Sequence, residues 1–146
     1  MNKRKGFSLV ELLIVIVIMG ILGAGVMLSS GGAVASARAL TIINDLRSLK
    51  EAALLFYLDN PEGTLNIENL KTYIDNSEKL GENTLYEVST STGGVYFIGY
   101  SLTSVPNKTA VQNSLKSRAK DAGLYGLNTN AAATYNGEDK VYIKAY

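Results

Sequence analysis

Residues 7–28, FSLVELLIVIVIMGILGAGVML, form the stretch that decides the fold. From Leu12 to Leu28, 17 consecutive residues carry no charge and no polar side chain. A helix that crosses a bilayer needs about 20 apolar residues, with about 17 as the lower limit. The stretch therefore predicts a transmembrane helix, to which we assign residues 7–32.

The residues on either side of this stretch predict its orientation. Three cations, Lys3, Arg4 and Lys5, precede it, and the positive-inside rule then predicts a cytoplasmic amino terminus with the remaining chain outside the cytoplasm. A plain membrane anchor and a secretory signal peptide are the alternatives. Small residues at 33–35 and 35–37 offer cleavage sites, but the apolar run exceeds the roughly 7–15 residues of a signal-peptide core.

Glu11 is the one charge inside the apolar stretch. A carboxylate at the bilayer centre costs about 2.5–3.5 kcal/mol on insertion scales, and less near the end of a helix. Such a residue predicts a functional site and needs a partner. The alternative interpretation is a solvated side chain at the level of the headgroups.

Residues 5–13, KGFSLVELL, strongly resemble the amino terminus of type IV pilins and their relatives, the type II secretion pseudopilins and competence pilins. The shared pattern is a short basic leader ending in Gly, a Phe-Ser/Thr-Leu-x-Glu start and about 20 apolar residues. The resemblance implies that residues 1–6 are a leader removed by a prepilin peptidase after Gly6. Phe7 then becomes the N-methylated amino terminus, and the Glu11 carboxylate neutralises the Phe7 ammonium of a neighbouring subunit or of its own chain.

The resemblance also implies partners and a location. It implies a homo-oligomeric helical filament, a prepilin peptidase that methylates the new terminus, and an inner-membrane assembly platform. The chain has no phosphate-binding loop, so the assembly ATPase is a separate protein. We expect a single-pass prepilin in the bacterial cytoplasmic membrane and then an extracellular or periplasmic filament.

We predict the major pilin of a type IV pilus. Whether the filament serves adhesion, twitching motility, DNA uptake or protein export depends on the machine that assembles it. A type II secretion pseudopilin or a competence pilin is the alternative within the family. A secreted or membrane-anchored binding domain is the alternative from another class. Cleavage would leave 14 − 3 = 11 Lys and Arg against 13 Asp and Glu, a side-chain charge of −2.

The sequence departs from the family at Leu28, where many members have proline. It has five glycines nearby instead, and each weakens a helix by about 1 kcal/mol relative to Ala. These glycines predict either close helix packing or, as the resemblance favours, a segment that unwinds on assembly: Gly20, Gly23, Gly25, Gly31 and Gly32.

The helical pattern continues beyond the apolar stretch. Over residues 33–59, apolar residues recur at spacings of three and four, as in an amphipathic helix. Asp59, Asn60 and Pro61 predict its end. A helix over Phe7–Leu58 has 52 residues and would be about 78 Å long. The apolar stripe comprises Leu40, Ile43, Leu46, Leu49, Ala53 and Phe56.

Residues 60–146 predict a small globular head. Asn66 would cap a short helix ending near Asn76, strands are expected at 85–89 and 95–103, and a helix capped by Asn107 should end at Gly123. A final strand at 141–146 is expected at a sheet edge. The predicted class is α+β: a long helix, hydrophobic and protruding in its first half, packed through its amphipathic half on a small antiparallel sheet.

Composition argues against catalysis. His and Cys are both 0, which excludes Ser-His triads, cysteine nucleophiles and the commonest metal ligands. We predict no enzyme, cofactor or metal site, and the near-balanced charge argues against a nucleic-acid partner. The cations at 108, 116, 118 and 120 and the carboxylates of Glu138 and Asp139 are interpreted as solvated, not as DNA or calcium sites. The 9 Tyr are interpreted as packing residues.

Overall fold

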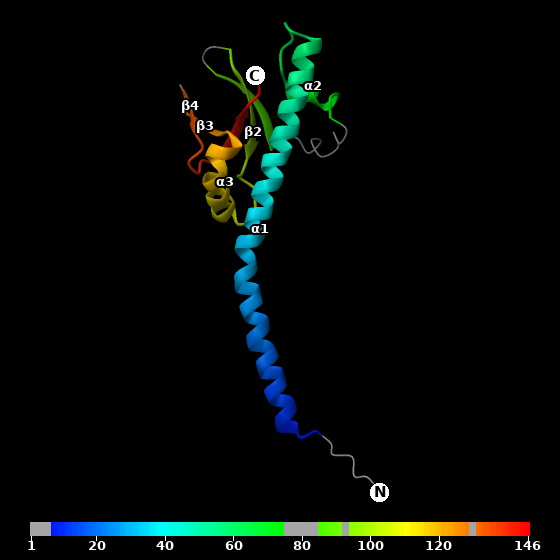
Figure 1. Cartoon of the computed structure of the whole chain (residues 1–146), viewed down its shortest axis with the longest axis vertical. Coiled ribbons are helices and arrows are strands. Elements are labelled where there is room, and N and C mark those ends of the chain that lie inside the picture. Colours follow the sequence, from blue (N-terminus) through cyan, green and yellow to red (C-terminus); the bar gives the residue numbers. More distant parts are fainter. Residues whose placement is uncertain (1–6, 75–84, 92–93, 129–130) are drawn as a thin grey trace. The chain divides into compact units, whose positions relative to one another are not determined.

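The computed structural model describes residues 7–74, 85–91, 94–128 and 131–146, with the side chains of 24–30, 127, 128, 131 and 132 excepted. The chain divides into two compact units, Met1–Val34 and Ala35–Tyr146. Helix α1, Leu9–Asp59, contributes to both units (Figure 1). The predicted helix and its stop before Pro61 are confirmed to within two residues at either end.

The first unit consists of α1 and the residues before it. Its large apolar side chains from Leu9 to Leu22 are between 46% and 82% exposed. The predicted leader, residues 1–6, lies outside the described residues. For residues 7–32 we predicted a transmembrane segment; in the part of the chain that the structure describes, no helix is both long and apolar enough to cross a membrane.

In the second unit, α1 buries one face against the head. Its buried side chains include Leu46, Leu49 and Phe56, as the apolar periodicity predicted. Leu40 was wrongly placed on this face, because it is 47% exposed. Ala39 and Ile42 are buried in its place. They precede the fully buried Leu46 by seven and four residues and so share its face, whereas Leu40 precedes it by six and points away.

Within the described residues the strands form one five-stranded sheet of order β1-β2-β5-β3-β4, with every neighbouring pair antiparallel. The predicted hairpin at 85–103 is confirmed as β1 and β2. The strands are β1 Tyr86–Thr90, β2 Tyr96–Ser101, β3 Leu124–Asn128, β4 Ala131–Thr134 and β5 Lys140–Lys144.

The last strand corrects the prediction. β5 pairs with β2 on one side and β3 on the other, so it is a central strand and not an edge. Val141, Tyr142 and Ile143 are all buried. Successive residues of a strand face opposite sides of the sheet, so β5 is covered on both faces. A strand with both faces covered belongs in the interior of a sheet.

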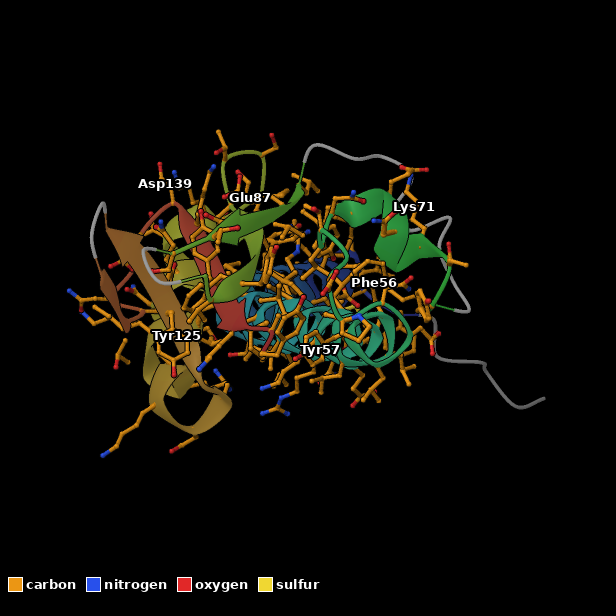
Figure 2. All side chains as sticks on the ribbon, turned by 90° about the horizontal axis from the view of Figure 1, so that it is seen from above. Phe56, Tyr57, Lys71, Glu87, Tyr125 and Asp139 are labelled. Carbon is orange, nitrogen blue, oxygen red and sulfur yellow. The ribbon has the colours of Figure 1, made fainter. Side chains whose placement is uncertain are left out.

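The short helix is α2, Ile67–Lys71. The Asn66 side chain caps it as predicted, accepting a hydrogen bond from the Asn69 N–H at 2.8 Å. The predicted extension to Asn76 is wrong, because α2 ends at Lys71 and its C-cap is Thr72. α2 lies beside the upper part of α1 (Figure 1), close to Phe56 (Figure 2).

The third helix is α3, Lys108–Ala122, which ends at Gly123 as predicted. Gly123 has φ 65°, the left-handed conformation that glycine adopts without strain. Asn107 occupies the N-cap, but its side chain makes no capping hydrogen bond and its backbone is left-handed, with φ 56°. Asn tolerates this conformation better than most residues.

One hydrophobic core joins the parts of the head. Leu46 of α1, Leu115 of α3 and Ile98, Val141 and Ile143 of the sheet all belong to it. α1 and α3 therefore cover the same face of the sheet, and the predicted α+β class is confirmed (Figure 1).

On the opposite face, a polar cluster links three strands. Glu87 of β1 accepts hydrogen bonds from Lys140, at 2.6 Å, and from the Tyr142 hydroxyl, both of β5. Gly99 of β2 lies between them, and a Cβ at that position would overlap the Tyr142 ring. Burial raises the pKa of Glu87, but the hydrogen bonds from Lys140 and Tyr142 outweigh it and hold this pKa below its usual value of 4.5.

Glu87 should make the head less stable in acid. A carboxyl with a lowered pKa in the folded state adds stability above its unfolded pKa, and that stability is lost as the pH falls through the folded pKa. We expect the free energy of unfolding to fall below pH 4.5, and Glu87→Gln to weaken this dependence. Denaturant titrations between pH 7 and pH 3 (about the range in which carboxyls titrate) measure it. Glu62→Gln, at an exposed position, is the matched control, and an equal effect of both would contradict the role of Glu87.

Candidate processing and assembly site

The amino terminus of α1 carries a reciprocal pair of hydrogen bonds. The Ser8 backbone N–H donates to Glu11 Oε2 at 2.8 Å, and the Glu11 N–H donates to Ser8 Oγ at 3.2 Å. Ser8 also accepts the first helical hydrogen bond, from the Leu12 N–H at 3.2 Å. Ser8 is therefore the N-cap and Glu11 the third helical residue of a capping box.

This arrangement fixes a negative charge at the end of the helix. Glu11 is exposed, and the positive end of the helix dipole favours a carboxylate in the first turn. Phe7, 84% exposed, immediately precedes the cap. A new amino terminus at Phe7 would thus stand one residue from the N-cap, at the same end of the helix as the carboxylate.

The structure places two of the three predicted terminal residues, Phe7 and Glu11, at the same end of α1. Gly6 lies outside the described residues. Ser8 was missed as a positioning residue, although the spacing Ser-x-x-Glu is the sequence signature of a capping box. That spacing alone could have found it.

The predicted glycine segment is helical. Gly20, Gly23, Gly31 and Gly32 all lie within α1, and a Cβ on any of them would meet no atom within 4 Å. The surroundings of Gly25 lie outside the described side chains. No contact described within the chain therefore requires glycine at these four positions.

The cations of α3 are partly engaged within the head. Lys108 pairs with Asp139 at 2.6 Å, and Arg118 donates to the carbonyl oxygen of Ser114 at 3.0 Å. The hydrogen bond from Lys108 holds the pKa of Asp139 below its usual value. Lys116 and Lys120 are exposed. Only two of the four cations are thus left on an open face of the helix.

The two carboxylates weighed as calcium ligands have partners in the protein. Glu138 Oε2 accepts a hydrogen bond from the Asn136 N–H at 2.8 Å, and Asp139 pairs with Lys108. Across the described ranges, no three His, Cys, Asp or Glu residues gather as a metal would require.

The alternative cleavage sites lie within α1. Ala35 and Ala39 are 2% and 0% exposed and belong to the core of the head. Their small side chains lie in the same core as Val111 and Leu115 of α3, where Ser114 Oγ also donates to Ser36 Oγ at 3.3 Å. Cleavage after residue 35 or residue 37 would therefore remove Ala35 from the core of the head.

An open-sided cavity of about 320 Å³ lies between α1 and residues 104–106, which precede α3, and Leu85 and Tyr100 also line it. Arg38 and Asp45 border it; Arg38 donates to the carbonyl oxygen of Pro106 at 3.3 Å, and Asp45 accepts from the Tyr86 hydroxyl at 2.9 Å. Burial, with the charge and hydrogen bond of Asp45, raises the Tyr86 pKa. Both charged groups at the cavity are thus engaged within the head.

Comparison with known proteins yields one match. A family model described as the prokaryotic N-terminal methylation motif matches residues 1–27. No curated protein and no solved structure matches the chain. The matched residues include Gly6, Phe7 and Glu11, and the motif implies processing by a prepilin peptidase. The first 27 residues are therefore the class III signal of type IV pilins and pseudopilins, and this signal supports a pilin-like or pseudopilin protein.

Proposed function

We propose that this chain is the major structural subunit of a type IV pilus. It would be inserted in the cytoplasmic membrane, cut after Gly6, methylated on the Phe7 amino group and assembled into a helical filament. The observation that carries the proposal is the methylation motif at residues 1–27, with Glu11 at the fifth position of the processed chain.

The Glu11 carboxylate would form the ion pair that guides assembly. An ammonium group and a carboxylate are each costly in an apolar medium, and removing one partner of a buried pair costs about 3–5 kcal/mol. Four residues of helix rise only about 6 Å, so a Phe7 ammonium lies within reach of a Glu11 carboxylate on a neighbouring copy. The ion pair would therefore stabilise one axial offset between neighbouring subunits over the others.

The apolar surface of the first unit fits this function. The side chains of Leu9–Leu22 are exposed in the single chain, and a large exposed apolar surface needs a partner. Lipid would cover it before assembly, and the same segment of other subunits would cover it in the filament. A peptidase, an inner-membrane platform and an ATPase would act on the chain.

Amino-terminal sequencing with intact-mass spectrometry tests the proposal on protein from the native membrane and from sheared surface fibres. We expect a start at Phe7 with one added methyl group, about 14 Da. Gly6→Leu should keep Met1, which confirms the position of the cut. A start at Met1, Ser36 or Arg38 in the natural chain would overturn the filament function. Methylated chain that never enters surface fibres would instead indicate a pseudopilin.

The glycines give a separate test of assembly. We propose that the segment of Gly20, Gly23, Gly25, Gly31 and Gly32 unwinds when a subunit enters the filament. Changing Gly20, Gly23, Gly31 and Gly32 to Ala would stabilise the helix by about 1 kcal/mol per site. We expect normal cleavage and methylation but fewer filaments per membrane-bound subunit, measured by immunoblotting both fractions. An unchanged ratio would contradict unwinding.

A further inference from the structure

The edge of the sheet formed by β4 has no role in the function proposed above. β4, Ala131–Thr134, stands last in the order β1-β2-β5-β3-β4 and pairs with β3 on one side. In the part of the chain that the structure describes, no strand pairs with its other side. Such an edge presents backbone N–H and C=O groups to which another strand can bind.

The register of β3 and β4 shows which backbone groups point out of the sheet. The Tyr135 N–H donates to the Leu124 carbonyl oxygen at 3.0 Å, so these two residues form a hydrogen-bonded pair. Such pairs alternate along an antiparallel ladder, and Ala133, two residues earlier, therefore also bonds to β3. The N–H and C=O groups of Ala132 and Thr134 then point to the open side. The edge thus offers two donors and two acceptors.

β4 lies on the side of the head away from α1. Figure 1 and Figure 2 show β3 and β4 at one side of the head and the part of α1 that belongs to the head at the other. The sheet order agrees, because Tyr86 of β1, at the opposite end of the sheet, donates to Asp45 of α1. In the proposed filament the α1 helices gather in the core, so β4 would face outward.

β4 has neither a charge nor a proline to block pairing. Natural proteins often protect an edge strand with charged residues, especially lysine, or with proline, and residues 131–134 include neither. The other edge strand, β1, carries Glu87. β4 is therefore the edge better suited to accept a further strand.

We propose that β4 pairs antiparallel with β4 of a second copy of this chain, about a two-fold axis at Ala133. Ala132 of each copy then faces Thr134 of the other, and the outward groups of these residues make four hydrogen bonds. Ala133 faces Ala133, so no like charges meet. The edge is thus complementary to itself in register and in charge, and this selects a second copy as its partner.

This contact would join subunits of different filaments, and in that respect the inference rests on the proposed function. A two-fold contact closes on itself, whereas the contacts that build a helical filament are head-to-tail and do not close. Pairing of β4 therefore adds no subunit to a filament but holds two filaments side by side. A single contact of two four-residue strands is small, but a filament repeats it along its length, and the contacts act together.

Ala132→Pro in the full chain tests the hydrogen bonds. Proline removes the outward N–H of residue 132 and is tolerated on the open side of an edge strand. We expect sheared filaments of this variant to associate side by side about tenfold less than natural filaments, because the loss repeats at every contact. Low-speed sedimentation and electron microscopy measure the association. Ala132→Ser keeps the N–H and is the matched control, which should associate normally.

Charges at Ala133 test the two-fold axis. Ala133 is exposed, and in the pair it faces its own copy, where like charges are destabilising and opposite charges favourable. We expect Ala133→Lys filaments alone, and Ala133→Glu filaments alone, to stay single. Mixed in equal amounts, they should associate to within about twofold of natural filaments, because each lysine then faces a glutamate. A folding defect could not be restored by mixing. The same two changes at the exposed Thr109 of α3 should leave association unchanged.

Cysteine crosslinking tests the geometry without background, since the natural chain has no Cys. Facing residues at this position of an antiparallel pair have Cα atoms about 4.5 Å apart, which a disulfide can bridge. Oxidised Ala133→Cys filaments should give dimers, and Thr109→Cys filaments should not. When tagged and untagged Ala133→Cys filaments are mixed before oxidation, a mixed dimer should form, because the contact lies between filaments.

The outcomes separate this inference from the proposed function. Natural filaments that stay single, Ala132→Pro filaments that still associate, or a mixture of Ala133→Lys and Ala133→Glu that stays single would each overturn the inference. Absence of the mixed dimer would do the same. Methylated Phe7 in those filaments would leave the pilin function standing. Absence of methylated Phe7 from the natural chain would overturn the proposed function itself.

Discussion

Replacing Glu11 with alanine should leave a chain that is inserted, cut after Gly6 and methylated but assembles poorly. An unpaired Phe7 ammonium in an apolar core costs about 3–5 kcal/mol, which is more than a hundredfold in an equilibrium constant. We expect a loss of filaments of that order. The measurement compares sheared fibres with membrane-bound subunits, and the mass of the membrane fraction confirms processing.

The capping box provides controls that separate charge from helix capping. Glu11→Gln removes the charge, while Gln still serves as the third residue of a capping box. Ser8→Ala removes the hydroxyl that accepts from the Glu11 N–H and keeps the charge. We expect Glu11→Gln to be as defective as Glu11→Ala, and Ser8→Ala to assemble nearly normally. Normal fibres from Glu11→Gln would contradict the ion pair and assign Glu11 to the cap alone.

Replacing Leu46 with alanine should be among the most destabilising single changes to the head. Leu46 is 0% exposed and belongs to the core shared by α1, α3 and the sheet. A Leu-to-Ala change at such a site costs about 2–5 kcal/mol, because transfer free energy is lost and a cavity remains. With 9 Tyr and no Trp, near-ultraviolet circular dichroism of tyrosine during denaturation measures the loss.

Leu58→Ala is the matched control for the core substitution. The same side chain is removed from the same helix, but at a position that is 72% exposed. We expect the free energy of unfolding to change by less than about 0.5 kcal/mol. Equal losses from both variants would contradict the assignment of the buried face of α1.

Much of the fold was predictable because strong local signals produced it. The apolar run, the amphipathic periodicity and Pro61 define α1, and the β-branched and aromatic residues around Ile98 define the first hairpin. β3 and β4 were missed because LYGLN includes Gly and Asn and AAAT is mostly Ala, and strands usually disfavour these residues. Sheet pairing, not local preference, makes them strands. The edge assignment of β5 failed for the same reason, since strand order depends on contacts distant in sequence.

Some residues of the candidate site could also be identified from the sequence, and others only from the structure. Gly6, Phe7 and Glu11 were recognisable because they stand at fixed positions in a short motif. The hydrogen bonds of Ser8 follow from the equally local spacing Ser-x-x-Glu. The exposed side of α1 in the head could not be predicted from the sequence, because Leu40 and Ile43 are similar residues. Only packing against the head leaves Leu40 exposed and buries Ile43.

The central position of β5 has a consequence for incomplete chains. β5 holds the β1-β2 hairpin and the β3-β4 hairpin in one sheet, yet it follows both hairpins in the chain. A chain truncated before Lys140 keeps two hairpins whose inner edges are unpaired, and such edges invite aggregation and degradation. Only a chain that includes β5 can therefore complete its sheet, and a truncated chain is left with unpaired strand edges.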